Sequence, residues 1–290
     1  MDNKWQENCI LCPVECGANR LNGVGACGVK GLRIAKYYLH PFEEPCISFE
    51  KGSGTIFFCG CNLRCAYCQN YEVSRAMRGK EVSPKELADI FRELENMGAD
   101  NISLVTPSHV VPLIVQALKL YKPKIPLVYN SGGYEKVETL RLIDKYVDIY
   151  LPDVKFYSPA LSKRYLGKED YFDIASKAVA FMAQKPLSMT ETGKMLSGCI
   201  VRHLVMPLCT ADCKRILKWF SEELPKDTYL SVMSQYTPFG KIDSFPELSR
   251  KITAREYDAA VETAFALGIQ NLFIQERTSA KTEYIPSWDF

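Results

Sequence analysis

The sequence predicts an α/β fold built on a parallel β-sheet. Along most of its 290 residues, short apolar segments alternate with amphipathic segments that have helical periodicity. Strand and helix in alternation indicate right-handed βαβ units, and six or seven such units predict a barrel or most of one. The candidate strands are 54–58, 101–105, 125–129, 148–154, 199–206, 228–233 and 271–274.

Two of the helices between these strands have clear start signals. The run from Ser83 to Glu86 is a capping box with proline at the first helical position, and apolar residues then recur on one face until Gly98. The run from Thr253 to Glu256 repeats the capping box ahead of a second periodic segment, which stops at Gly268. Both segments are predicted to be helices on the outside of the sheet.

Polar residues gather where the predicted strands end. In barrels of parallel strands the active site is built at the carboxyl ends of the strands and in the loops that follow. We therefore expect these side chains to converge on one mouth. The candidates are Thr106 to His109, Asn130 to Gly133, Asp153, Lys155, Arg202, His203, Gln235, Tyr236, Gln275 and Glu276.

Three cysteines follow the first predicted strand at a spacing that indicates metal chemistry. Cys61, Cys65 and Cys68 form a C-x3-C-x2-C run. Three thiolates can wrap a cubane iron–sulfur cluster that normally takes four, which leaves one iron open to a non-protein ligand. A zinc knuckle is the alternative, but a tetrahedral zinc site needs a fourth protein ligand, and the neighbouring side chains offer none.

A second group of cysteines lies near the amino terminus. Cys9, Cys12, Cys16 and Cys27 form a C-x2-C-x3-C-x10-C set, which is complete for four-ligand metal binding. Such a set suits a structural zinc ion or a second, closed iron–sulfur cluster. The spacing does not choose between the two.

The composition narrows the class of protein. The net charge of +2 gives no basic footprint for nucleic acid and no polybasic membrane patch. No run of roughly 18 apolar residues is present, and the first residues do not resemble a signal peptide. The expected location is the cytoplasm, where twelve cysteines point to metal ligation or catalysis and not to disulfides.

Five cysteines belong to neither group. Cys46, Cys59 and Cys199 are expected to be small buried hydrophobes. Cys209 and Cys213 follow the fifth predicted strand near the expected mouth, so a redox, substrate-handling or metal role is an alternative to burial there.

Beyond the cysteine triad, six runs resemble the PflX-like branch of the radical S-adenosylmethionine (radical SAM) proteins, relatives of pyruvate formate-lyase activating enzymes. The resemblance extends from Cys9 to about Pro286, through CILCPVEC, GSGTIFF, NSGGYE, LPDVKF, VRHLVMP and MSQYTP. It implies a partial (β/α)6 TIM-like barrel of the radical SAM type at 48–290, preceded by a small Cys-rich metal-binding segment at 1–47. It also implies a [4Fe-4S] cluster on the triad, with SAM as cosubstrate or cofactor.

The resemblance assigns contacts with SAM by position. Tyr67 is expected against the adenine, and Asn130 and Ser131 near the ribose and sulfonium. Asp153 and Lys155 match the Asp-x-Lys that ends the next strand.

Two further contacts and one departure complete the expected SAM site. Arg202 matches an Arg on the fifth strand, and Gln235 lies where the sixth strand meets the adenosyl group. Many radical SAM proteins hold the SAM ammonium with a Gly-Gly-Glu run, whereas this chain offers only the hydroxyls of Thr106 and Ser108 at that place.

The resemblance implies an oxidoreductase that cleaves SAM to a 5′-deoxyadenosyl radical and abstracts hydrogen from a substrate. That substrate is a glycine of a glycyl radical enzyme, another peptide or a small molecule, and the electron comes from a reductant such as flavodoxin or ferredoxin. No protein residue is assigned as catalytic. The alternatives are a non-catalytic electron carrier with two closed clusters and a zinc-organised binding module.

Overall fold

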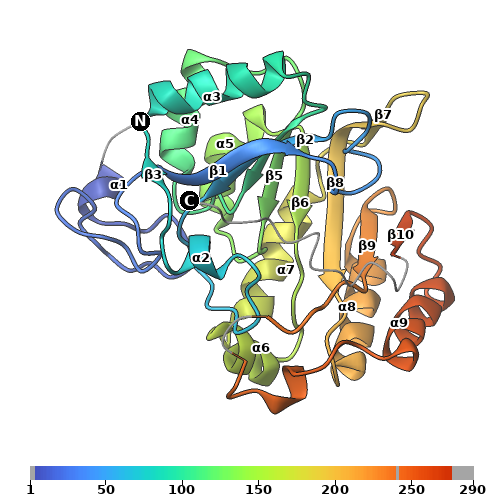
Figure 1. Cartoon of the computed structure of the whole chain (residues 1–290). Helices are drawn as coiled ribbons and strands as arrows, with labels where there is room; N and C mark the ends of the chain where they lie inside the picture. Colours follow the sequence, from blue (N-terminus) through green and yellow to red (C-terminus); the bar gives the residue numbers. More distant parts are fainter. Residues whose placement is uncertain (1–3, 240–241, 276–290) are drawn as a thin grey trace.

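One long β-sheet organises the chain in a computed structural model that describes residues 4–239 and 242–275 (Figure 1). Across the sheet the strands run in the order β10-β9-β8-β6-β5-β4-β2-β1-β3, and β7 pairs with β8 beside this path. The strands are β1 (Arg33–His40), β2 (Ser53–Phe58), β3 (Lys80–Glu81), β4 (Ile102–Val105), β5 (Leu127–Ser131), β6 (Ile149–Pro152), β7 (Ser188–Met189), β8 (Met195–Leu204), β9 (Tyr229–Met233) and β10 (Leu272–Ile274).

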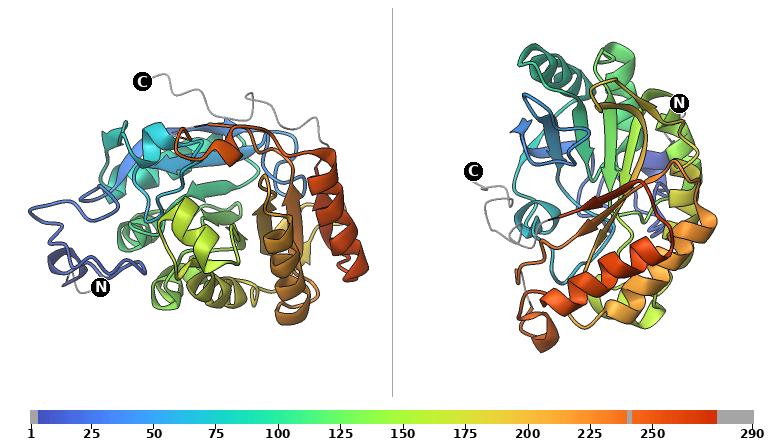
Figure 2. Two further views of the ribbon diagram at one scale, coloured as in Figure 1. Left: turned by 90° about the horizontal axis from the view of Figure 1, so that it is seen from below. Right: turned by 90° about the vertical axis from the view of Figure 1, so that its right-hand side faces the viewer.

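Helices cover the outer face of this curved sheet. In Figures 1 and 2, α3, α4, α5, α7, α8 and α9 lie side by side along that face. The helices are α1 (Lys4–Glu7), α2 (Tyr71–Ser74), α3 (Pro84–Asn96), α4 (Val111–Leu120), α5 (Val137–Ile143), α6 (Pro159–Leu166), α7 (Tyr171–Met182), α8 (Thr210–Glu223) and α9 (Ala254–Ala266), with short 3-10 turns η1 (Asp144–Tyr146) and η2 (Pro246–Leu248).

All seven predicted strands are present, and they pair in parallel as β2, β4, β5, β6, β8, β9 and β10. Two strand pairs complete the sheet at its other edge, where β1 runs antiparallel to β2 and β3 antiparallel to β1. Within the described residues, β10 and β3 are the two ends of the strand path and do not pair with each other. The predicted partial barrel is thus confirmed as an open, mostly parallel sheet.

Alternation along each strand separates the outer core from the interior of the barrel. On β5, Tyr129 packs with the helices, while its neighbour Val128 faces inward. On β6, Tyr150 likewise belongs to the outer core, and Ile149 and Leu151 to the inner one. A strand turns successive side chains to opposite faces, so one apolar run supplies both cores.

The loop at 41–52, between β1 and β2, fills the interior at the amino-terminal ends of the parallel strands. We call it the inner loop. Its residues Cys46 and Ile47 pack against the inward side chains of β5, β6 and β8. The Asp100 carboxylate accepts three of its backbone N–H groups, those of Phe49, Lys51 and Gly52, at 2.9–3.2 Å. A loop with its backbone donors satisfied in this way is a fixed part of the core.

Both predicted capping boxes are confirmed. The Ser83 hydroxyl accepts the Glu86 N–H and the Glu86 carboxylate accepts the Ser83 N–H, so α3 begins at Pro84. Thr253 and Glu256 do the same for α9. In the described part of the chain, no helix is long and apolar enough to cross a membrane.

The outer core yields a test of the strand assignment. Leu104 on β4 is fully buried against the helices, so Leu104→Ala should leave a cavity and lower the free energy of unfolding by about 2 to 5 kcal/mol. Urea denaturation followed by circular dichroism measures this loss. Leu120→Ala at the end of α4, where the side chain is 62% exposed, is the control and should cost far less. Equal losses from the two variants would contradict the assignment.

Candidate active site

The ends of the parallel strands meet at a cavity of about 270 Å³. Its wall includes all three triad cysteines, Cys61, Cys65 and Cys68, which follow β2. Around them lie seven of the eight strand-end residues that were predicted to contact SAM, each near the end of its strand. These are Thr106, Asn130, Ser131, Asp153, Lys155, Arg202 and Gln235. The folded chain therefore brings the triad and these strand-end residues into one site.

Ser108, predicted to contact SAM, does not reach the cavity wall. The strand-end candidates His109, His203 and Gln275 do not line the cavity either, and Glu276 lies outside the described residues. The Ser108 hydroxyl donates a short hydrogen bond to the carboxylate of Glu135, which also accepts the Tyr129 hydroxyl at 3.2 Å. Burial raises the pKa of Glu135 to about 7. Ser108 thus satisfies a buried carboxyl behind the wall, while Thr106 alone of the two hydroxyls faces the cavity.

Thr106 is held in an unusual backbone conformation. Its φ is +61°, and its N–H donates to the Asn130 carbonyl at 2.8 Å. A non-glycine residue in the left-handed region costs free energy and is held there by its surroundings. The turn after β4 therefore presents Thr106 to the cavity at a fixed position.

The triad loop is organised around its sulfur atoms. The Leu63 N–H points to the Cys61 Sγ at 3.4 Å, and the Cys68 Sγ lies 3.3 Å from the Ser74 hydroxyl. One guanidinium nitrogen of Arg75 donates to the Leu63 carbonyl, while its Nη1 is buried without a partner among the described residues. Donors aimed at sulfur are what an anionic thiolate-bound cluster requires around it.

Burial favours the protonated form of two triad cysteines, Cys61 and Cys65. It raises the pKa of the Cys61 thiol to about 11 and that of the Cys65 thiol to about 12. The positive charges of Lys155 and Arg75 act in the opposite direction and favour the thiolates. Metal binding requires thiolates, so loading this site must release protons. The residues present therefore fit a three-thiolate cluster beside a cationic wall.

A network of four charged side chains forms the floor of the cavity. Arg202 donates through Nε to Asp153 Oδ1 at 2.9 Å, and its Nη1 lies 3.5 Å from a Glu43 carboxylate oxygen. Lys155 Nζ donates to the other Asp153 oxygen at 2.7 Å. Burial alone would favour a neutral Asp153, but Arg202 and Lys155 lower its pKa below the ordinary value.

Asn130 joins this network from β5. Its side-chain oxygen accepts from Arg202 Nη2 at 2.7 Å, and its amide donates to Glu43 at 3.3 Å. Two carboxylates and two cations thus balance one another around an amide. Such a surface presents donors and acceptors together, which suits a ligand with both an ammonium and a carboxylate group.

Glu43 is a site residue that the sequence did not reveal. It lies on the inner loop, far from every predicted strand end, and still reaches the cavity wall. It supplies a carboxylate to a site whose sequence lacks the glutamate of the Gly-Gly-Glu run. No local pattern marks it, because its partner Arg202 is 159 residues away.

Aromatic rings form the wall beside the triad. Tyr67 is buried and meets Phe156 and Tyr236 edge to face, with ring centroids 6.2 Å apart in both pairs. Tyr165 continues this cluster beyond Phe156. A rigid aromatic surface of this kind offers a flat ligand ring a place to pack.

The amino-terminal cysteines lie together on the other side of the triad loop. Cys9, Cys12 and Cys27 are buried, and Cys16 is exposed. A Cβ added at Gly25 would lie 3.2 Å from the Cys27 Sγ and 3.7 Å from the Cys16 Sγ, so both sulfurs flank that glycine. Burial raises the pKa of the Cys12 thiol to about 12. In residues 4–239 and 242–275, no three His, Cys, Asp or Glu side chains are already arranged as a metal site.

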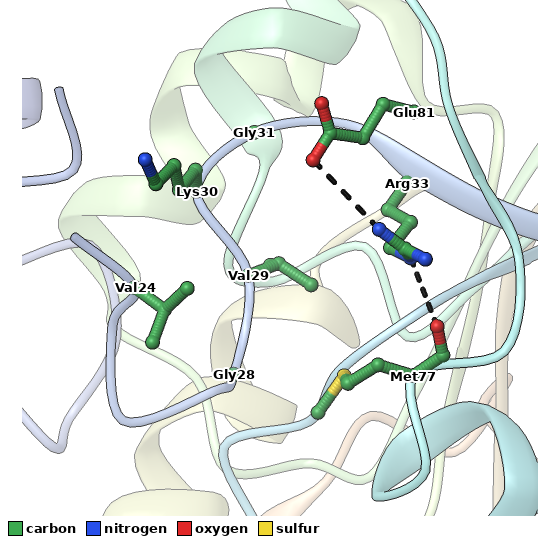
Figure 3. Close-up of a pocket in the computed structure, with 8 residues that line it drawn as sticks. All are labelled: Val24, Gly28, Val29, Lys30, Gly31, Arg33, Met77 and Glu81. Atoms are coloured by element: carbon green, nitrogen blue, oxygen red, sulfur yellow. Dashed lines mark hydrogen bonds and ion pairs between the residues drawn. The ribbon is translucent and has the colours of Figure 1, made fainter. Parts of the chain in front are cut away.

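A second, smaller cavity of about 120 Å³ lies beside the amino-terminal cysteine loop (Figure 3). Val24, Gly28 and Lys30 line one side of it. Opposite them, Arg33 donates to the Met77 carbonyl at 2.9 Å and lies 3.7 Å from a Glu81 carboxylate oxygen. The arginine of this pocket is therefore already paired within the protein.

The remaining cysteines lie away from the active-site wall. Cys46, Cys59 and Cys199 are buried in separate parts of the core, as expected. Cys209 and Cys213 are buried as well, and neither lines the cavity.

Two buried histidines also belong to the core. His203 holds the Val154 carbonyl through Nδ1 at 2.8 Å, and His109 the Cys59 carbonyl through Nε2 at 2.8 Å. Burial lowers the pKa of each to about 4. Both are therefore neutral in the folded protein near pH 7.

Comparison with known proteins agrees with this geometry. The model of the radical SAM superfamily matches residues 55–187, which begin on β2 and include the triad. The uncharacterized protein MJ0674 of Methanocaldococcus jannaschii is 31% identical over 268 residues, covering 89% of this chain and 74% of that protein.

A solved structure shares the fold. SuiB of Streptococcus suis bound to S-adenosylmethionine aligns over 80% of this chain with 13% identity and a TM-score of 0.50. A domain of pyruvate-formate lyase-activating enzyme from Bacteroides vulgatus ATCC 8482 aligns over 67% of this chain and 91% of its own, with 10% identity and a TM-score of 0.39. This chain spans about half the length of SuiB, 48% in the SAM-bound structure.

The chain belongs to the radical SAM superfamily. Membership implies a [4Fe-4S] cluster and SAM, and hence SAM-dependent radical chemistry. The three triad thiols on the wall of a cavity with a balanced polar floor fit both groups.

A buried carboxyl beside this floor gives a pH test. Burial raises the pKa of Glu44 from 4.5 to about 7. Between these values the folded protein holds a proton that the unfolded chain has released, so the free energy of unfolding should fall as the pH rises through this window. Glu44→Gln should make that fall shallower in urea titrations.

The control for the pH test lies on the same inner loop. Glu50 is exposed, and Glu50→Gln should leave the slope as in the parent. A slope that Glu44→Gln does not change would show that Glu44 is not the group responsible.

Proposed function

We propose that the triad of Cys61, Cys65 and Cys68 holds the [4Fe-4S] cluster and that SAM binds in the adjoining cavity. The observation that supports this most directly is that the three thiols and the strand-end polar residues line one cavity. When bound and reduced, the cluster supplies the electron that cleaves SAM to methionine and a 5′-deoxyadenosyl radical.

The chain's own residues bind and orient SAM in this proposal. The Tyr67 ring packs against the adenine, and the charged side chains of the cavity floor bind the polar groups of SAM. Glu43 and Asp153 are the acceptors for the ammonium, and Arg202 and Lys155 the donors for the carboxylate or ribose oxygens. Their mutual ion pairs hold these groups in place before SAM arrives, which lowers the cost of ordering them on binding.

The remaining binding groups come from neighbouring strand ends. Asn130, Ser131 and Gln235 face the cavity and can bind the ribose, and Thr106 replaces the missing carboxylate at the end of β4. Glu43 compensates for that carboxylate from the opposite side of the site.

The radical would take a hydrogen atom from a substrate, which would give 5′-deoxyadenosine and a substrate radical. In line with the PflX-like resemblance, we propose a peptide or protein substrate, with the glycine of a glycyl radical enzyme as one candidate and a small molecule as the alternative. A one-electron carrier such as flavodoxin or ferredoxin is the proposed reductant.

The competing hypothesis is an electron carrier with two closed clusters. A closed cluster on the triad would need a fourth ligand, and the cysteines that line the cavity in the described part of the chain are Cys61, Cys65 and Cys68. A cluster with one open iron beside a cavity of this size would favour the enzyme over the electron carrier.

Removal of the triad tests the enzyme hypothesis. Anaerobically reconstituted protein given SAM and dithionite should form 5′-deoxyadenosine and methionine, and the variant with all three triad cysteines changed to Ala should form neither, because no cluster can deliver the electron. Liquid chromatography with mass detection measures both products.

The matched control for this experiment is Cys199→Ala, which removes a thiol buried in the outer core. It should still yield both products. Cleavage of SAM by the triple Ala variant would contradict the proposed function.

We also propose that Cys9, Cys12, Cys16 and Cys27 bind a separate metal. In the triple Ala variant, about four iron per chain would identify a second cubane and about one zinc a structural site. Metal analysis by mass spectrometry decides between them. Neither metal at stoichiometric level would contradict the assignment of these four cysteines.

A further inference from the structure

Arg20 is a buried cation with no carboxylate partner in the described part of the chain. Its residue is 3% exposed, and no ion pair joins it to an Asp or Glu there. The guanidinium Nη1 donates to the His109 carbonyl at 2.6 Å, whereas Nε and Nη2 are buried with no partner. A buried charge without a counter-charge is costly, and so are buried donors without acceptors.

The groups around Arg20 that can carry negative charge are sulfur atoms. Its Nη1 lies 3.8 Å from the Cys9 Sγ, and the Cys16 Sγ lies 4.0 Å from the Cys9 carbonyl. The indole Nε1 of Trp5, which packs in the same cluster as Cys9, is also buried without a partner. Unpaired donors therefore surround the amino-terminal thiols, and a metal with four thiolate ligands supplies the negative charge and the acceptors that they lack.

The other contact of Arg20 leads to the triad loop. The His109 carbonyl accepts its Nη1, and the His109 ring is hydrogen-bonded to the Cys59 carbonyl, two residues before Cys61. Gly60 has a φ of +87°, and a Cβ there would lie 3.2 Å from the His109 Nε2 and 2.6 Å from the Cys27 carbonyl. The backbone that leads into Cys61 is thus held between His109 and the amino-terminal loop.

Two direct hydrogen bonds join the same loops. The Cys61 N–H donates to the Cys27 carbonyl at 3.3 Å, and Arg64 donates to the Ala26 carbonyl at 2.9 Å. A member of the amino-terminal set is therefore bonded, through its backbone, to a member of the triad. The backbones of the two sets are thus in direct contact.

We propose that Arg20 couples the two cysteine sites. It is the counter-charge of a metal centre with four thiolate ligands, Cys9, Cys12, Cys16 and Cys27. Through His109 and the Cys27–Cys61 hydrogen bond, that centre positions the triad loop. The proposal rests on the proposed function for the cluster and SAM at the triad. Arg20 is a positioning residue and touches neither SAM nor substrate. Loading of the amino-terminal metal then prepares the triad for its own cluster and for SAM.

The test compares Arg20→Gln and Arg20→Lys in the full-length, anaerobically reconstituted protein. Arg20→Gln removes the charge and should weaken metal retention at the amino-terminal set roughly ten- to hundred-fold under competition with a chelator. It should also change the electron paramagnetic resonance signal of the reduced, SAM-bound triad cluster and raise the Kd for SAM. Arg20→Lys keeps the charge and should restore part of each property.

Arg33→Gln is the matched control. Arg33 lies on the same stretch of chain but is paired with Glu81 and Met77 (Figure 3), so its loss should leave metal retention and the resonance signal as in the parent. Arg20→Gln protein that keeps its amino-terminal metal and gives the parent's signal and SAM affinity would overturn the proposal.

Cys16→Ala separates the coupling from the folding role of a buried arginine. Cys16 is the exposed member of its set, so its truncation leaves the core and Arg20 in place. Loss of the amino-terminal metal should again shift the triad signal and weaken SAM binding. A variant that loses that metal while the triad keeps the parent's signal and SAM affinity would show that the two sites are independent.

The parent protein distinguishes this inference from the proposed function. If the parent shows no SAM-dependent change in the triad signal, the proposed function is wrong. Metal retention by Arg20→Gln then still decides whether Arg20 is the counter-charge of the amino-terminal centre.

Discussion

The ion pair between Asp153 and Arg202 is the interaction on which the cavity depends. Backbone pairing of β6 with β8 covers Ile149 to Tyr150, and beyond it the two strands are joined at an isolated bridge between Asp153 and Arg202. The side-chain pair, at 2.9 Å, continues the connection where the ladder stops. Removing one partner of a buried pair costs about 3 to 5 kcal/mol where nothing else compensates the charge. Here Lys155 also pairs with Asp153, and Glu43 with Arg202, which lowers that cost. The strand ends that carry the site are thus held in register by the groups that would bind the ligand.

The same side chains thus hold the strand ends together and line the cavity. Arg202 also reaches Asn130 on β5 and Glu43 on the inner loop, so three parts of the chain meet at one guanidinium. A ligand that hydrogen-bonds to one of these donors or acceptors has to leave the other charged groups of the network paired. The floor can accept a molecule that brings both signs of charge, since a lone anion or cation would leave an opposite charge unpaired.

The sequence predicted the parallel strands because their apolar runs are local signals. The predicted fifth strand was 199–206, whereas β8 begins at Met195. The prediction missed the start of β8 because Leu196, in the hairpin with β7, is 40% exposed and does not show the pattern of a core strand. β1 was missed because its mixed residues are mostly half-buried at the antiparallel edge of the sheet. The triad and most strand-end residues were found from their order along the chain. Glu43 and Arg20 did not stand out, since their partners Arg202 and His109 are distant in sequence.

The raised thiol pKa values of Cys61 and Cys65 affect how readily these two side chains react when no metal is bound. The nucleophilic and oxidisable form of cysteine is the thiolate, so a buried thiol that keeps its proton reacts slowly with oxidants and with other thiols. With pKa values of about 11 and 12, these two side chains stay protonated near pH 7. Burial in this way slows oxidation of Cys61 and Cys65 when no metal is bound to them. Because metal binding must release these protons, the affinity of the two thiols for a metal falls as the pH falls.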